Sequence, residues 1–140
     1  MSPRGERAPS AARRTVLLAE DDPDLLRVAE VTLRLGGYRV LAAADGESAL
    51  ALVRRARPDV VLLDLRLPGL DGWELLERLR SDAALERVPV VVVTASADPS
   101  ERERASAARV VDFLVKPMSA DTLLAAVERA LSESEPAPRS

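Results

Sequence analysis

The sequence contains no cysteine and no histidine among its 140 residues. Without cysteine, it can form neither a disulfide framework nor a thiolate metal site. Without histidine, it has no imidazole to act as a general base, a zinc ligand or a phosphorylated residue. These two absences exclude a large part of enzyme chemistry.

Long apolar runs and excess positive charge are also missing. No apolar run approaches the roughly 18 residues that a membrane helix needs, and residues 1–14 contain arginines without the apolar segment of a secretory signal. The formal net charge is -3, whereas binding to nucleic acid depends on positive charge. We therefore expect a soluble cytoplasmic protein with no direct nucleic-acid partner and no membrane insertion.

Composition divides the chain into one folded part and two tails. Hydrophobic residues make up 47% and charged residues 31%, which is typical of a globular domain. Residues 1–14 are rich in Arg, Ala, Pro and Ser, and residues 132–140 are rich in Ser, Glu and Pro. Neither end has enough apolar surface to offset the entropy lost on ordering. We predict a single domain over residues 15–131, between two disordered tails.

Within the predicted domain, short β-branched runs alternate with helical patterns five times. This alternation is typical of βαβ units and predicts an α/β fold with a parallel sheet covered on both faces. Helices are expected after the caps Asp22 and Ser119, from about Gly46, and from about Pro99. The expected strands are Thr15–Ala19, Tyr38–Ala43, Asp59–Leu63, Val90–Thr94 and Phe113–Val115.

The helix expected from about Pro99 to Ala108 contains no large apolar side chain. Burying one Leu or Val side chain stabilises a fold by roughly 1.5–3 kcal/mol, and alanine contributes much less. We therefore predict that this helix is the least firmly packed element of the domain.

Polar residues follow four of the five expected strands. Glu20 and Asp21 follow the first strand, Asp64 follows the third, Thr94 closes the fourth and Lys116 follows the fifth. In an open parallel sheet, ligands bind in the crevice beyond the carboxyl ends of the strands. We expect these five side chains to face one crevice. Singly, each would more commonly be a cap or a loop residue, so the combination carries the prediction.

The three carboxylates indicate a site for a hard divalent cation. Close carboxylates repel one another unless a cation shares them, and Mg²⁺ prefers oxygen ligands. Asp64 beside bound Mg²⁺ would be ionised at neutral pH and could attack phosphorus without a base. Lys116 and Thr94 would supply the cation and the hydroxyl that stabilise a transferring phosphoryl group. Two other acids are assigned structural roles, Asp22 as a helix cap and Asp71 as a turn residue.

These residues, in their order and spacing, resemble the receiver domain of bacterial two-component response regulators. The resemblance covers about residues 15–131 and implies a flavodoxin-like, doubly wound sheet of five parallel strands in the order 2-1-3-4-5, with five helices. The matching residues are Glu20-Asp21, Asp64 with Pro68 and Gly72, Thr94-Ala95, Phe113 and Lys116-Pro117.

The resemblance also implies roles for individual residues. Asp64 would accept a phosphoryl group from a sensor histidine kinase or a phosphotransfer protein, and Lys116 would contact that group. Mg²⁺ would be held by Asp21, Asp64 and the backbone carbonyl of Arg66, with Glu20 acting largely through a bound water.

A switching mechanism is implied as well. On phosphorylation, Thr94 would move towards the phosphoryl group and Phe113 would turn inwards. The face made by the fourth helix, the fifth strand and the fifth helix would then change and bind a downstream protein target. Arg109 stands where family members often have glycine, so strain or an altered helix end is expected there.

Three functional hypotheses follow from the sequence. The first is a stand-alone, single-domain response regulator, monomeric at rest and able to associate when phosphorylated, which catalyses only its own phosphorylation and dephosphorylation. The second is a receiver-like interaction module that acts independently of phosphorylation. The third, a phosphohydrolase of the haloacid dehalogenase type, normally has a second Asp where Arg66 stands. A flavodoxin is disfavoured because residues 20–24, which include four acids, would repel the flavin phosphate.

Overall fold

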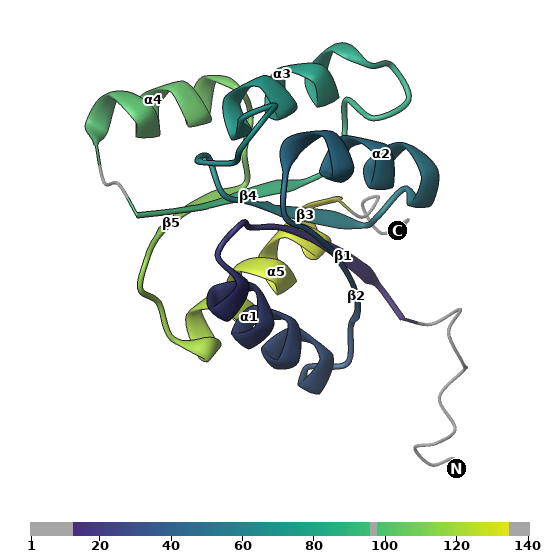
Figure 1. Cartoon of the computed structure of the whole chain (residues 1–140), viewed down its shortest axis with the longest axis vertical. Helices are drawn as coiled ribbons and strands as arrows, with labels where there is room; N and C mark the ends of the chain where they lie inside the picture. Colours follow the sequence, from purple (N-terminus) through teal and green to yellow (C-terminus); the bar gives the residue numbers. More distant parts are fainter. Residues whose placement is uncertain (1–12, 96–97, 135–140) are drawn as a thin grey trace, which may run out of the picture.

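The protein is described by a computed structural model that defines residues 13–95 and 98–134. These residues form one five-stranded sheet with helices on both faces (Figure 1). The strands are β1 (Thr15–Ala19), β2 (Arg39–Ala43), β3 (Val60–Leu63), β4 (Val90–Thr94) and β5 (Asp112–Val115). The helices are α1 (Pro23–Leu35), α2 (Gly46–Ala56), α3 (Gly72–Ser81), α4 (Pro99–Ala107) and α5 (Ala120–Ser134).

The sheet has the predicted topology. All four strand pairs are parallel, and the strand order is β2-β1-β3-β4-β5. Helices α1 and α5 cover one face, and α2, α3 and α4 cover the other (Figure 1). The flavodoxin-like α/β fold with five helices is thereby confirmed.

The core lies on both faces of the three central strands. Along β1, Val16 belongs to one apolar cluster and Leu17 to the other, and Val60 and Val61 alternate in the same way on β3. All four side chains are fully buried. Strands that are buried on both faces read as continuous apolar runs, which explains why these segments show no polar alternation.

Side-chain caps fix the starts of all five helices, with Asp45 at the start of α2 and Asp98 at the start of α4. The Asp22 carboxylate caps α1, and the Ser119 hydroxyl accepts a hydrogen bond from Thr122 N–H at 3.1 Å, so both predicted caps are confirmed. Asp71 has a more defined role than the predicted turn residue. It caps α3 in a reciprocal capping box with Glu74, in which each side chain accepts a bond from the other residue's backbone N–H.

Several boundaries differ slightly from the sequence prediction. Strand β2 begins at Arg39 and not at Tyr38, β3 begins at Val60 and not at Asp59, and β5 begins at Asp112 and not at Phe113. Helix α5 continues to Ser134, so residues 132–134 belong to the helix and not to the predicted C-terminal tail. A helix commonly continues for a fraction of a turn beyond its last buried residue, here Leu131. Residues 1–12 and 135–140, where the disordered tails were predicted, lie outside the described part of the chain.

Helix α4 is polar, as expected, and ends at a strained residue. Of its nine residues, all of them described, Ala105 alone is buried. Just beyond the helix, Arg109 has φ 64°, the left-handed conformation that disfavours residues other than glycine. The expected strain at this position is confirmed. No helix within residues 13–95 and 98–134 has the length and apolar character that a membrane span requires.

Candidate functional site

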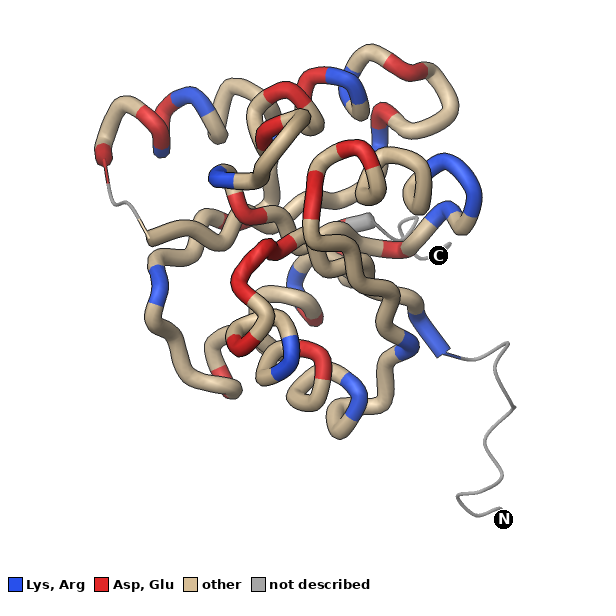
Figure 2. Tube along the Cα trace, in the orientation of Figure 1, with Lys and Arg blue, Asp and Glu red and all other residues tan. Residues whose placement is uncertain are grey.

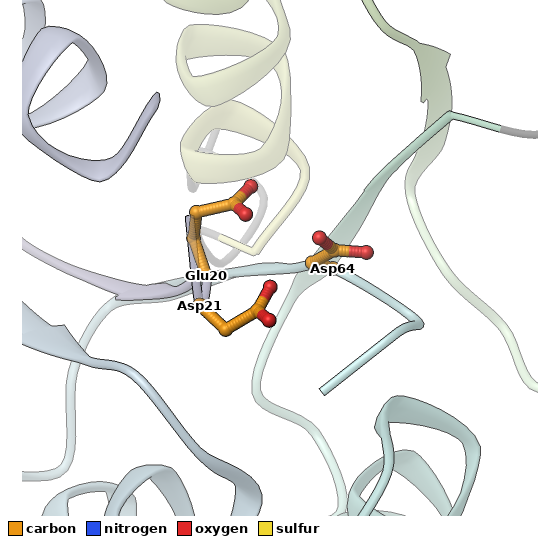
Figure 3. A group of neighbouring side chains, drawn as sticks. All are labelled: Glu20, Asp21 and Asp64. Carbon is orange, nitrogen blue, oxygen red and sulfur yellow. The ribbon is translucent and has the colours of Figure 1, made fainter. Parts of the chain in front are cut away.

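Strand register brings the acidic residues to one edge of the sheet. Ala19 of β1 lies opposite Leu63 of β3, and Asp64 N–H donates to the carbonyl of Ala19 at 3.0 Å. The residues that follow these two strands, Glu20 and Asp64, are therefore held at the same level. Figure 3 shows Glu20, Asp21 and Asp64 gathered at these strand ends.

The three carboxylates form a compact cluster. One oxygen from each of Glu20, Asp21 and Asp64 lies within 4.8 Å of the others. Glu20 and Asp64 are buried, whereas Asp21 is exposed. In Figure 2, acidic residues follow β1 at the centre of the view. Three adjacent negative charges in a partly buried position favour binding of a divalent cation.

Lys116 connects two of the carboxylates. Its Nζ lies 2.6 Å from Glu20 Oε1 and 2.9 Å from Asp64 Oδ2, and its side chain is only 17% exposed. Lys116 N–H donates to the carbonyl of Thr94 at 2.8 Å, which fixes the lysine beside the end of β4. It is also the only lysine in the sequence. Lys116, the predicted cation, therefore contacts Asp64, the predicted phosphoryl acceptor, directly.

The surroundings shift the pKa values of two site residues. Burial raises the pKa of Glu20, the charge of Asp64 adds to this increase, and the hydrogen bond from Lys116 offsets part of it. Burial alone would lower the pKa of Lys116, but its hydrogen bonds to Glu20 and Asp64 and their negative charges outweigh that effect. The pKa of Lys116 is consequently raised, and the side chain is a cation at neutral pH.

The Asp64 carboxylate is oriented by a hydrogen bond to each oxygen. Oδ1 accepts a hydrogen bond from the backbone N–H of Arg66 at 2.9 Å, and Oδ2 accepts one from the Lys116 ammonium. Gly72 allows the start of α3 to pack closely against the backbone of Asp64, since a Cβ at this position would lie 2.6 Å from the Asp64 carbonyl oxygen. The Asp64 carboxylate is therefore held in one orientation within a tightly packed loop.

The remaining predicted residues occupy neighbouring positions. Thr94 ends β4 and is fully buried, while Phe113 lies on β5 opposite Val92 and is 9% exposed. The ring of Phe113 is thus already buried in this structure. The Arg66 backbone lies beside Asp64, and its carbonyl as a metal ligand stays a prediction.

Two residues that the sequence pattern did not single out support the loop after β3. Glu47 Oε1 accepts the N–H of Leu70 at 3.3 Å, and Gly46 N–H donates to the carbonyl of Pro68 at 3.3 Å. Both residues stand at the start of α2. A Cβ on Gly46 would lie 1.6 Å from the Leu70 carbonyl oxygen. The loop can therefore lie this close to the start of α2 only if residue 46 is glycine. The one sequence signal was a glycine directly after the capping Asp45.

A largely apolar cavity of about 470 Å³ opens beside the carboxylates. It lies between α1 and the start of α5, and it reaches the site at Glu20, Asp64 and Lys116. A partner approaching Asp64 would therefore meet apolar surface next to the charged cluster.

Comparison with known proteins agrees with this geometry. Residues 16–128 match the family described as the response regulator receiver domain. The chain belongs to this family. Receiver domains are signalling modules of two-component systems, so the acidic cluster of this receiver domain fits a phosphorylation site.

Three similar proteins illustrate the relationship. The receiver domain shares 36% identity over 126 residues with the DNA-binding response regulator MtrA of Mycolicibacterium smegmatis, covering 90% of this chain and 54% of MtrA. It shares 32% identity over 117 residues with Protein PilH of Pseudomonas aeruginosa, covering 84% of this chain and 97% of PilH. Among solved structures, the receiver domain of the sensor histidine kinase PA1611 from P. aeruginosa has a TM-score of 0.79 and 37% identity. That match covers 86% of this chain and 99% of the other.

The chain spans about half the length of the first curated relatives that it matches. Several of these relatives are named as transcriptional regulators or as DNA-binding proteins. The similarity covers only the matching part of these relatives. The activities of their remaining parts therefore cannot be assigned to this chain.

Proposed function

We propose that this receiver domain accepts a phosphoryl group on Asp64 from the phosphohistidine of a sensor histidine kinase or a phosphotransfer protein, in a Mg²⁺-dependent reaction. An Asp64 oxygen would attack phosphorus, the bond from phosphorus to the donor nitrogen would break, and an acyl phosphate would form on Asp64. The observation that carries the proposal is the Lys116 ammonium, which bridges Asp64 and Glu20 beside the carboxylate cluster.

The donor set fits Mg²⁺. Three carboxylates against one ammonium leave excess negative charge, and hard oxygen ligands suit this ion. Asp21, Asp64 and the Arg66 carbonyl would hold it, with Glu20 acting through water. When bound, the ion would neutralise charge on the phosphoryl oxygens. The PA1611 receiver domain has a magnesium ion coordinated in its active-site cleft.

The side chains of this chain would provide positioning and charge. Lys116 would transfer its hydrogen bond from Asp64 to a phosphoryl oxygen, and the Thr94 hydroxyl would donate to another. Arg66 N–H would keep Asp64 in its orientation throughout. Apart from its own phosphorylation and dephosphorylation, we propose no catalytic activity.

The output would be a change in the face made by α4, β5 and α5, read by a downstream protein target. Thr94 and Phe113 would carry the change from Asp64 to that face. We propose a single-domain response regulator that works in the cytoplasm without direct nucleic-acid contact, monomeric at rest and able to associate when phosphorylated. PilH, of which the match covers 97%, is an example of a relative that consists of little more than this domain.

An interaction module that acts independently of phosphorylation is the second candidate. It is favoured by the ring of Phe113, which is already buried in the unphosphorylated chain. If switching requires the Phe113 ring to turn inwards on phosphorylation, a ring that is already buried would change its position little.

Intact-protein mass spectrometry after incubation with acetyl phosphate and Mg²⁺ tests the proposal. We expect one phosphoryl group on the wild type, none on Asp64→Asn, and an unchanged result for the matched control Asp121→Asn on the exposed start of α5. A chelator should abolish the uptake. Uptake by Asp64→Asn would assign another acceptor. No uptake by the wild type, even from a phosphorylated kinase, would favour the phosphorylation-independent module.

A further inference from the structure

Helix α4 is attached to the domain by arginine side chains in place of an apolar face. Beyond the small buried side chain of Ala105, two of its arginines lie over aromatic rings. The guanidinium carbon of Arg102 is 4.7 Å from the ring centroid of Phe113, and that of Arg104 is 4.2 Å from the ring centroid of Trp73. A guanidinium over an aromatic face is attracted by the negative face of the ring.

A third arginine fixes the C-terminal end of α4. Arg80, at the end of α3, donates from Nε to the carbonyl of Ala108 at 2.9 Å. Its Nη1 donates to the carbonyls of Glu86 and Val88 at 3.0 and 2.9 Å. One guanidinium therefore joins α3, the segment before β4 and the end of α4, so this end of the helix has a firm attachment.

Arg102 has a distinct position among these contacts because its ring partner is the predicted switch residue. Phe113 is 9% exposed, and the Arg102 guanidinium covers a face of its ring. If the ring turned outwards, this stack would break and α4 would lose one of its two aromatic contacts. The conformation of the ring and the attachment of α4 are thus linked through one side chain.

We propose that Arg102 is a positioning residue that holds the Phe113 ring in its buried conformation and ties that conformation to the placement of α4. Arg104 on Trp73 restrains the same helix without touching Phe113. The proposal concerns the unphosphorylated protein; only its consequence for the output face rests on the proposed function.

Each aromatic residue can be observed separately, because the sequence contains one Phe and one Trp. Ring-labelled phenylalanine gives a single set of NMR signals from Phe113, and fluorescence excited at a wavelength that Tyr38 does not absorb reports Trp73 alone. The variants are Arg102→Ala, the conservative Arg102→Lys, and Arg104→Ala as the counterpart on the other ring. Glu103→Ala, on the exposed side of α4, is the matched control.

We expect Arg102→Ala to shift the ring signals of Phe113 and to raise the population of the outward ring about two- to five-fold, the range for one exposed cation–π contact. Arg102→Lys should retain part of the wild-type behaviour because a cation remains near the ring. Arg104→Ala should change the emission of Trp73 and leave the Phe113 ring signals in place. The control should change neither probe.

Two results would overturn the proposal. One is an unchanged Phe113 signal in Arg102→Ala. The other is an equal response of both aromatic probes to Arg102→Ala and Arg104→Ala, which would indicate general loosening of α4. The ring measurement needs neither Asp64 nor a phosphodonor, so its failure leaves the proposed function standing. Conversely, loss of phosphoryl uptake would not alter the ring measurement.

Discussion

Gly37 and Arg109 occupy the same position in two helix ends that are built alike. At the end of α1, Gly37 N–H donates to the carbonyl of Arg34 at 3.0 Å, and Tyr38 N–H donates to the carbonyl of Leu33 at 3.1 Å. This pair of bonds defines a Schellman motif, whose left-handed position is usually glycine.

The end of α4 repeats both bonds without the glycine. Arg109 N–H donates to the carbonyl of Ser106 at 2.9 Å, and Val110 N–H donates to that of Ala105 at 3.2 Å. The backbone at Arg109 has φ 64°, a conformation in which the Cβ of an L-residue crowds the following carbonyl oxygen. The helix end is therefore formed normally, at a cost in strain.

Replacing Arg109 with glycine should stabilise the protein. We expect the free energy of unfolding to rise by about 0.5–1 kcal/mol, because relief of left-handed strain exceeds the larger entropy of glycine in the unfolded chain. Urea denaturation measures the change. Glu103→Gly, in the interior of the same helix, is the control and should lose roughly 0.5–1 kcal/mol. A less stable Arg109→Gly would show that the Arg109 side chain itself contributes more than the strain removes.

Removal of the lysine should leave two buried carboxylates without their cation. Lys116→Met keeps most of the side-chain volume, and we expect the free energy of unfolding to fall by about 1–3 kcal/mol in the absence of divalent ions. Added Mg²⁺ should restore more stability to this variant than it adds to the wild type, because the ion replaces the lost positive charge. Thermal unfolding with and without Mg²⁺ tests both expectations. Equal stability of variant and wild type without metal would contradict them.

Tyr38 should ionise at higher pH than a free tyrosine. Burial raises the pKa of its hydroxyl, Glu128 adds to the increase, and Arg14 offsets part of it. Tyr38 is the only tyrosine, so phenolate absorbance in an alkaline titration reports it directly. The pKa of Tyr38 is higher in the folded protein than in the unfolded chain. The contribution of the neutral tyrosine to the free energy of unfolding is therefore fully present at pH values below the pKa of the unfolded chain. It is lost as the pH rises through the folded value.

A matched pair of variants on α5 separates the causes of the Tyr38 shift. Glu128→Gln should lower the midpoint partway towards that of free tyrosine, since burial is the larger cause. Glu133→Gln, an exposed acid near the end of the same helix, should leave the midpoint unchanged. A wild-type midpoint at or below that of free tyrosine would contradict the assignment.

Gly46 should tolerate no side chain. In Gly46→Ala, the new Cβ would start 1.6 Å from the Leu70 carbonyl oxygen, so the loop after β3 must move. We expect a loss of about 2–3 kcal/mol in the free energy of unfolding. Gly36→Ala is the control, because its nearest neighbour is the flexible end of the Leu124 side chain at 2.8 Å. Similar losses for both variants in urea denaturation would argue against the close backbone contact.

The location of the candidate site was predictable because it depends on topology. Carboxyl ends of parallel strands meet at one edge, so the residues that follow the apolar runs must gather there. The proximity of Glu20, Asp64 and Lys116 follows from this rule and the sequence alone, and the structure confirms it.

Other features depend on side-chain reach and loop shape, which the sequence pattern does not encode. The acceptors of Arg80 are backbone carbonyls of two separate segments, the stretch before β4 and the end of α4, and no residue type marks a carbonyl as a partner. The bond from Leu70 to Glu47 likewise depends on how a loop folds back over α2. The pattern of α4 correctly predicted a helix without an apolar face, yet its arginine stacks on Phe113 and Trp73 were not apparent from spacing.

The bond between Lys116 and Glu20 joins residues 96 positions apart, and the bond between Lys116 and Asp64 spans 52 positions. No local stretch of this chain can assemble these groups, so they come together only when the strands that carry them have all joined the sheet. A nascent or partly unfolded chain would carry the aspartate without its lysine. If Asp64 accepts the phosphoryl group as proposed, only completely folded molecules would present it beside its lysine, and the site would respond only in an intact fold.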